Sequence, residues 1–162
     1  MRVYKPKVSM DTSSIVKWFK VEEGSGEALK LRKWTEEGGI KLVVSEILLS
    51  ECARGLKKAE WEDDEIYEVL EMLDTIIDLC GVDVIPVDRL VIKYAQNLVV
   101  KYDLYSADAI HAANAILTGS NYFVSSDGHH HKKDLKAHIE GKGVSVLTLS
   151  EVEVIEKDIE KT

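Results

Sequence analysis

The chain has 162 residues, of which 45% are hydrophobic and 31% are charged, and its formal net charge is -8. These values predict a single globular domain over residues 1–162 with a sizeable hydrophobic core. The negative charge excludes a generally basic nucleic-acid-binding surface, but not a local basic patch or a carboxylate site that uses a metal cation to approach phosphate.

The first predicted strand covers residues 7–10 and places Asp11 at its carboxyl end. Hydroxyl residues follow at once, so the next helix is predicted to be capped by Thr12 or Ser13. In open α/β sheets, ligands bind in the crevice at the carboxyl ends of the strands. Asp11 is therefore a candidate site residue, provided that the remaining chain supplies partners for it.

Short apolar runs then alternate with amphipathic segments along the chain. The other predicted strands, which are apolar or β-branched runs, cover residues 40–44, 82–87, 122–125 and 144–147. The predicted helices, which have apolar residues at helical spacing, cover residues 12–20, 25–37, 46–58, 60–78, 88–101, 107–118 and 132–140, and a final acidic helix follows. This alternation predicts a three-layer α/β/α sandwich with a mostly parallel central sheet of four to five strands.

The predicted helix over residues 60–78 has a strongly acidic outer face. Residues 60–78 include nine carboxylates and no Lys or Arg, while the apolar residues keep helical spacing. Such a face is most often a solvated surface. The alternative is a docking surface for a basic segment of a partner protein.

Three further carboxylates occupy positions comparable to that of Asp11. Asp127 follows a predicted strand, Asp108 lies in the first turn of a predicted helix, and Glu51 lies on the apolar face of the helix after the second strand. Taken singly, Asp11 and Asp127 could be turn residues, and Asp108 could be an acid favoured by the helix dipole. The dipole is the better explanation for Glu46, whereas the other four acids together predict an acidic site.

Clustered carboxylates repel one another, and a divalent cation removes this repulsion. Oxygen ligands suit Mg²⁺ or Mn²⁺, and such sites perform phosphoryl chemistry. The sequence has no GxGxxG, GxxxxGK[ST] or GxSxG motif that would favour a nucleotide-binding site or a serine nucleophile.

Three consecutive histidines, His129, His130 and His131, follow the fourth predicted strand. They are interpreted as part of a polar loop that is either solvated or forms a phosphate-contacting rim. A zinc site there would need further His or Cys ligands, which the surrounding sequence does not offer.

The location of the protein is also predicted from its sequence. The first residues lack the apolar core of a signal peptide, and no apolar run approaches the roughly 18 residues that span a membrane. The two cysteines, Cys52 and Cys80, lie in apolar helical patterns, which favours buried thiols over a disulfide. These features predict a cytoplasmic protein.

Four segments, taken in order, resemble a PIN domain, and in particular a VapC-type toxin ribonuclease. They are residues 8–13 (VSMDTS), 44–55 (VSEILLSECARG), 106–113 (SADAIHAA) and 123–127 (FVSSD). The resemblance spans nearly the whole chain and implies a PIN-like fold. It also implies a metal-dependent endoribonuclease that is the toxin component of a toxin–antitoxin pair. The alternatives are a PIN-domain RNA-processing nuclease without an antitoxin and a non-catalytic RNA-binding or scaffold module.

The resemblance also implies the residues of the site. The catalytic and metal-binding set, with Mg²⁺ or Mn²⁺ as the cofactor, would be Asp11, Glu51, Asp108 and Asp127. Ser13 and Ser125 fall where the family places polar residues close to its acids. Phosphate contacts are expected from Arg54, Lys57 and Lys132.

One position departs from the family pattern. Many relatives carry a second Asp or Asn two residues after the last site aspartate, and this chain has His129 there. The partners that the resemblance implies are an RNA substrate, a second copy of the chain in a homodimer, and a small antitoxin protein.

Overall fold

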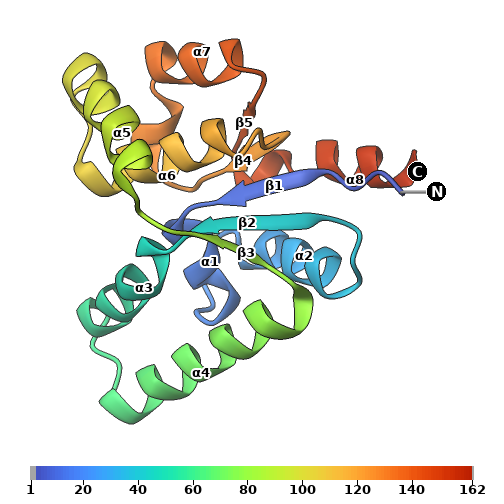
Figure 1. Ribbon diagram of the computed structural model, residues 1–162. Helices are drawn as coiled ribbons and strands as arrows, with labels where there is room; N and C mark the ends of the chain where they lie inside the picture. Colours follow the sequence, from blue (N-terminus) through green and yellow to red (C-terminus); the bar gives the residue numbers. More distant parts are fainter. Residues whose placement is uncertain (1–2, 162) are drawn as a thin grey trace.

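The central sheet of the protein is parallel throughout. The computed structural model describes residues 3–161, in which five strands are ordered β3-β2-β1-β4-β5 (Figure 1). The strands are β1 (Lys7–Met10), β2 (Lys41–Ser45), β3 (Asp83–Ile85), β4 (Tyr122–Val124) and β5 (Ser145–Leu147). Because β1 pairs with β2 on one side and with β4 on the other, Asp11 emerges from the middle of the carboxyl edge.

Helices cover both faces of this sheet, which confirms the predicted three-layer α/β/α architecture (Figure 1). The α-helices are α1 (Thr12–Ile15), α2 (Ser25–Glu36), α3 (Ile47–Lys58), α4 (Asp63–Cys80), α5 (Arg89–Tyr102), α6 (Ser106–Leu117), α7 (Lys133–Gly141) and α8 (Glu153–Glu160). Short 3-10 helices are η1 (Val16–Trp18), η2 (Gly128–His131) and η3 (Leu149–Glu151).

The alternation of side chains along the strands divides the hydrophobic core into two layers. Val124 packs on one face in a cluster with Leu48 of α3 and Ile155 of α8. Its neighbour Phe123 packs on the other face with residues of α5, α6 and α7, including Leu135. In Figure 1, α5, α6 and α7 lie above the sheet, and α2, α3 and α4 lie below it. Both faces of the sheet are thus packed by helices, and the carboxyl edge from which Asp11 emerges lies between them.

The helix that follows β1 is shorter than predicted and has a different cap. It consists of α1 continued by η1, and it ends at Trp18. The prediction that Thr12 or Ser13 caps it is wrong: the carboxylate of Asp11 accepts the N–H of Ser14 at 3.3 Å. The hydroxyl groups of Thr12 and Ser13 are consequently available to contact carboxylates.

The long helix α4 has the predicted amphipathic character. Its apolar residues Ile66, Val69, Leu73 and Ile76 are buried, while its acidic residues are exposed. It ends at Cys80 and is capped by Gly81, whose φ of 62° lies in the left-handed region that glycine adopts readily.

Two predictions from composition can be compared with the structure. Cys52 is buried, Cys80 is half-buried, and both thiols are free, as predicted. No helix within residues 3–161 is long and apolar enough to cross a membrane.

Candidate acidic site

The carboxyl ends of the strands form one edge of the sheet, on the left in Figure 1. Asp11 follows β1 and Asp127 follows β4, while Glu51 lies on α3 and Asp108 lies in the first turn of α6. Since β2, β1 and β4 are neighbours in the sheet, the topology brings the segments that follow them to the same edge.

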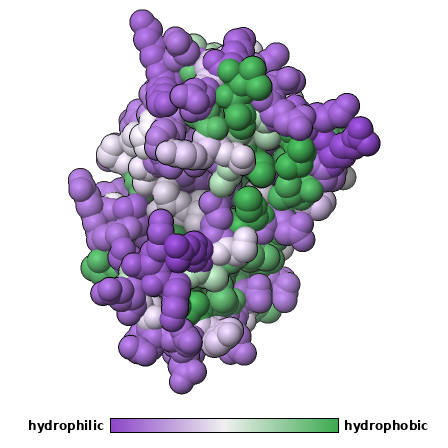
Figure 2. Space-filling model, turned by 90° about the vertical axis from the view of Figure 1, so that its left-hand side faces the viewer, coloured by the Kyte–Doolittle hydropathy of each residue, from purple (hydrophilic) through white to green (hydrophobic). Residues whose placement is uncertain are grey.

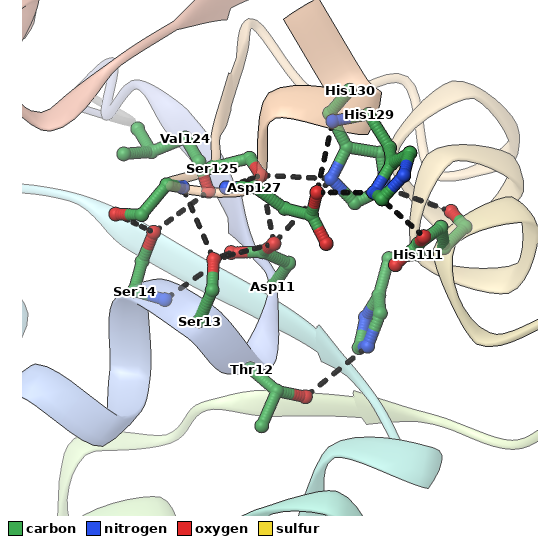
Figure 3. Close-up of polar contacts among 12 residues, drawn as sticks. Asp11, Thr12, Ser13, Ser14, His111, Val124, Ser125, Asp127, His129 and His130 are labelled. Carbon is green, nitrogen blue, oxygen red and sulfur yellow. Dashed lines mark hydrogen bonds and ion pairs between the residues drawn. The ribbon is translucent and has the colours of Figure 1, made fainter. Parts of the chain in front are cut away.

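Asp11 is buried, with an exposed fraction of 3%, and hydroxyl groups surround its carboxylate (Figure 3). Ser13 Oγ lies 2.8 Å from both carboxylate oxygens, and Ser125 Oγ donates to Oδ2 at 2.7 Å. Burial opposes ionisation of Asp11, but the hydrogen bond and charge of His130, with smaller effects of His111 and Ser125, outweigh it. The pKa of Asp11 is therefore lowered, and the group is held as a carboxylate.

His130 lies beside Asp11 and is completely buried. Its Nε2 is 2.9 Å from the backbone oxygen of Asp108, to which a ring nitrogen can only donate. Its Nδ1 is 2.7 Å from Ser125 Oγ. That hydroxyl gives its one hydrogen to Asp11, so Nδ1 must donate as well. A ring that carries two protons and a positive charge satisfies all these contacts.

The charged state of His130 agrees with the direction of its pKa. Burial lowers this pKa, but the hydrogen bond and the charge of Asp11 outweigh burial and raise it. The interpretation of the three histidines as a polar loop is therefore wrong for His130. The segment is the 3-10 helix η2, and His130 packs edge-on against Phe123 at a ring-centroid distance of 4.9 Å.

Glu51 is half-buried and is held by two other elements. Thr12 Oγ1 donates to Glu51 Oε1 at 2.7 Å, and His111 Nε2 contacts the same oxygen at 2.5 Å. Burial opposes ionisation, but His111 and Thr12 outweigh it, so the pKa of Glu51 is lowered. The charge of Asp11 acts in the opposite direction, which places the two carboxylates within electrostatic reach of each other. Glu46, by contrast, is exposed at the start of α3.

Asp108 and Asp127 approach each other at His129. A carboxylate oxygen of each and a ring nitrogen of His129 all lie within 4.8 Å of one another. Burial and the charges of Asp127 and Asp11 raise the pKa of Asp108, against the opposing effects of His130 and His129. For Asp127, burial is outweighed by the backbone N–H and the ring of His129, so its pKa is lowered.

The three basic residues predicted to contact phosphate lie on the surface of the protein. Arg54 and Lys57 are exposed on α3, where the ammonium group of Lys57 forms an ion pair with Asp63. Lys132 is exposed and directly follows η2. It lines a pocket of about 310 Å³ together with Lys101 and Lys133.

Three residues that hold the site were not found from the sequence. The signal for His111 was present, because it lies three residues after Asp108 on a helix and so shares a face with it. Thr12 was assigned to a cap instead. His130 had no usable signal, since its neighbours in the sequence are equally polar.

The donor set fits a divalent cation. Carboxylate oxygens are the ligands that Mg²⁺ and Mn²⁺ prefer. Burial first, and then the charges of Asp127 and Asp11, raise the pKa of Asp108, and a bound cation would favour its charged form.

Comparison with known proteins adds independent information. The family model described as PIN domain matches residues 8–136. No curated protein matches the chain.

Solved structures show a similar fold at low sequence identity. FitAcB from Neisseria gonorrhoeae has a TM-score of 0.64 at 16% identity, over 89% of this chain and 99% of that one. FitAB bound to an IR36 DNA fragment has a TM-score of 0.62 at 16% identity, over 88% and 94%. PAE2754 from Pyrobaculum aerophilum has a TM-score of 0.59 at 15% identity, over 98% and 100%. At such identities the likeness concerns the fold.

Proposed function

The chain belongs to the PIN domain family, whose model matches residues 8–136, and from this premise we propose that it is a metal-dependent endoribonuclease. The reaction is hydrolysis of phosphodiester bonds in RNA. The observation that carries the proposal is the meeting of Asp108 and Asp127 within 4.8 Å at His129, within electrostatic reach of the buried carboxylate of Asp11.

The residues that would hold Mg²⁺ or Mn²⁺ are Asp11, Glu51, Asp108 and Asp127. A bound divalent cation supplies Lewis-acid chemistry, because it withdraws negative charge from a phosphodiester and lowers the pKa of water.

The protein's own groups prepare this site for the reaction. Ser13 and Ser125 fix the orientation of the Asp11 carboxylate, and Thr12 with His111 fixes that of Glu51. Because these hydroxyl and imidazole groups are already hydrogen-bonded, little reorganisation is needed when substrate binds. One of the carboxylates can orient the attacking water and accept its proton.

Exposed basic residues on α3 and directly after η2 are proposed to contact the RNA backbone. Arg54 and Lys132 are exposed, and Lys132 adjoins η2. Lys57 would have to leave its ion pair with Asp63 before it could bind phosphate. Such contacts would make RNA binding weaken as the salt concentration rises.

We also propose that the protein forms a homodimer in the cytoplasm. Figure 2 views the edge to which the strands point and shows hydrophobic side chains gathered on one side of it. Residues of α5 and α6 line a groove of about 570 Å³, including Ile92, Val99 and Ile110. Val100 in this groove is 86% exposed, and a second copy of the chain would bury it.

A role as the toxin of a toxin–antitoxin pair would add a small antitoxin as partner. The acidic site and the exposed acidic face of α4 could each accept a basic segment of such a protein. A PIN-domain RNA-processing nuclease without an antitoxin would use the same site. A non-catalytic RNA-binding or scaffold module would not need the cation.

The decisive experiment compares RNA cleavage by wild type, Asp11→Asn and Asp108→Asn in Mg²⁺, Mn²⁺ or EDTA. Asp74→Asn is the matched control, since Asp74 is exposed on α4. We expect both site variants to lose about a hundredfold or more of the activity, because even residues that merely orient a metal ligand are worth 10–100-fold.

The alternatives give different results in the same preparations. Equal activity of wild type and both site variants would mean a contaminating nuclease or a wrong site. Calorimetric titration with Mn²⁺ distinguishes the nuclease from the non-catalytic scaffold module. The nuclease is expected to bind Mn²⁺, and the scaffold module is not.

A further inference from the structure

We propose that His129 is itself a metal ligand, so that the site holds its divalent cation with one imidazole nitrogen as well as carboxylate oxygens. The inference rests on the proposed function, because it concerns the cation of the same site. His129 is the third member of the cluster that it forms with Asp108 and Asp127.

The separations of the donor atoms support this assignment. His129 Nδ1 lies 2.7 Å from Asp127 Oδ1 and 3.7 Å from Asp108 Oδ2. Two ligands that are each about 2.1 Å from one ion can be at most ~4.2 Å apart. The pair with Asp108 lies within this limit, so one cation can be shared by the imidazole and that carboxylate. The pair with Asp127 is a hydrogen bond in the metal-free protein, and Nδ1 would exchange this bond for the ion.

The ring of His129 is held in this position from two sides. The backbone N–H of His129 donates to Asp127 Oδ1 at 2.8 Å, which fixes the start of η2. The ring packs edge-on against Tyr105, with a centroid distance of 5.5 Å and an interplanar angle of 89°. The side chain is 42% exposed, so water can hydrate Nε2 while Nδ1 faces the carboxylates.

The other two histidines of the segment are committed to protein contacts. His130 uses both ring nitrogens, toward Ser125 Oγ and the backbone oxygen of Asp108. His131 Nε2 bonds to the backbone oxygen of Ser125. Of the three consecutive histidines, His129 is the one whose nitrogen faces two carboxylates.

A nitrogen ligand changes which ions the site prefers. Imidazole is a good ligand for transition-metal ions such as Fe²⁺, Ni²⁺ and Zn²⁺. Mn²⁺ prefers oxygen ligands, but as a member of the same transition series it accepts a nitrogen ligand more readily than Mg²⁺ does. His129 should therefore raise the affinity for Mn²⁺ relative to Mg²⁺. A purely carboxylate site of the same shape would lack this selectivity.

The first test observes the ligand directly and requires no mutation. One equivalent of Mn²⁺ is added to wild-type protein, and the coupling of the electron spin to nearby nitrogen nuclei is measured by pulsed electron paramagnetic resonance. We expect a ¹⁴N coupling typical of a bound imidazole, which becomes a ¹⁵N coupling when histidine alone is labelled with ¹⁵N. Bound Mn²⁺ without any nitrogen coupling would overturn the proposal.

The second test assigns the nitrogen to His129. His129→Phe keeps a ring for Tyr105 and His129→Asn keeps a polar side chain, while His138→Ala is the control for loss of a histidine on α7. We expect the nitrogen coupling to vanish in both His129 variants and to persist in the control. The ratio of Mn²⁺ to Mg²⁺ affinity should fall by about tenfold in both His129 variants, within the range known for residues around metal sites.

The outcomes separate this inference from the proposed function. RNA cleavage that depends on metal, with Mn²⁺ bound but nitrogen coupling retained in His129→Phe, would overturn the role of His129 alone. Failure of wild-type protein to bind any divalent cation would overturn both. Circular dichroism of each variant establishes that it is folded before its spectrum is interpreted.

Discussion

Nδ1 of His130 lies 3.4 Å from Oδ2 of Asp11, and the two side chains are 0% and 4% exposed. A buried charge is tolerated only when it is paired and hydrogen-bonded. The imidazolium of His130 thus allows the first acid of the site to stay ionised before any metal ion is bound. The same ring reaches the backbone of Asp108, so it also joins β1 and α6 across the site.

Replacing His130 by Phe should destabilise the metal-free protein by about 3–5 kcal/mol, the cost of breaking a buried ion pair. Phe retains a ring to contact Phe123. Because the pKa of His130 is raised by folding, its stabilising effect is complete below about pH 6.5 and is lost as pH rises through the folded pKa.

Urea unfolding in EDTA between pH 5 and pH 9 measures this effect. The difference between wild type and His130→Phe should narrow toward the alkaline end. Asp11 has the opposite pH dependence, because folding lowers its pKa. Its ionisation stabilises the folded protein fully above about pH 3.8, and this stabilisation is lost as the pH falls through the folded pKa. If the free energies of unfolding of wild type and His130→Phe differed by the same amount from pH 5 to pH 9, the ion pair of His130 and Asp11 would be contradicted.

Thr12→Val should weaken the site without disturbing the core, since Val has nearly the shape of Thr but cannot donate to Glu51. We expect metal affinity and RNA cleavage to fall by about tenfold, as for other residues that orient ligands. Thr12→Ser keeps the hydroxyl group and serves as the control. Equal losses in Thr12→Val and Thr12→Ser would point to packing instead of the hydrogen bond.

Mn²⁺ should stabilise wild-type protein against unfolding. At a concentration one hundred times its dissociation constant, a ligand that binds only the folded state adds about 2.7 kcal/mol. Differential scanning fluorimetry should show a higher melting temperature for wild type, and a much smaller rise for Asp108→Asn and Asp127→Asn. An equal rise in all three proteins would place the metal elsewhere.

In EDTA, Asp108→Asn is not expected to lower the melting temperature relative to wild type. Burial and the neighbouring acids raise the pKa of Asp108, so its charged form is disfavoured in the folded state. Removing this charge should leave the melting temperature of the metal-free protein unchanged or higher. A clear decrease would mean that Asp108 has a structural partner that outweighs the repulsion.

Val100→Glu should convert a homodimer into a monomer, because it places a charge in the apolar groove between α5 and α6. Val21→Glu is the control: Val21 is 97% exposed and lies outside this groove. Size-exclusion chromatography with light scattering gives the mass of each protein. A dimer that survives Val100→Glu would show that the copies pair through another surface.

The sequence by itself determined the class of fold and the positions of the acids. Short β-branched runs such as residues 40–44 and the helical spacing of residues 60–78 are local patterns, and local patterns set the period of the backbone. Helical periodicity also placed Glu51 on the apolar face of its helix, where the structure has it half-buried. Glu46, which was attributed to the helix dipole, is exposed.

The tertiary structure decided which side chains hold those acids. His130 and Asp11 are far apart in the chain, and so are Thr12 and Glu51, and no local pattern encodes a contact between them. Each pair forms because neighbouring parallel strands bring their carboxyl ends together, after which burial makes every unpaired polar group costly. Local sequence patterns thus place Asp11 at the end of β1, and only tertiary packing brings the imidazole ring of His130 beside it.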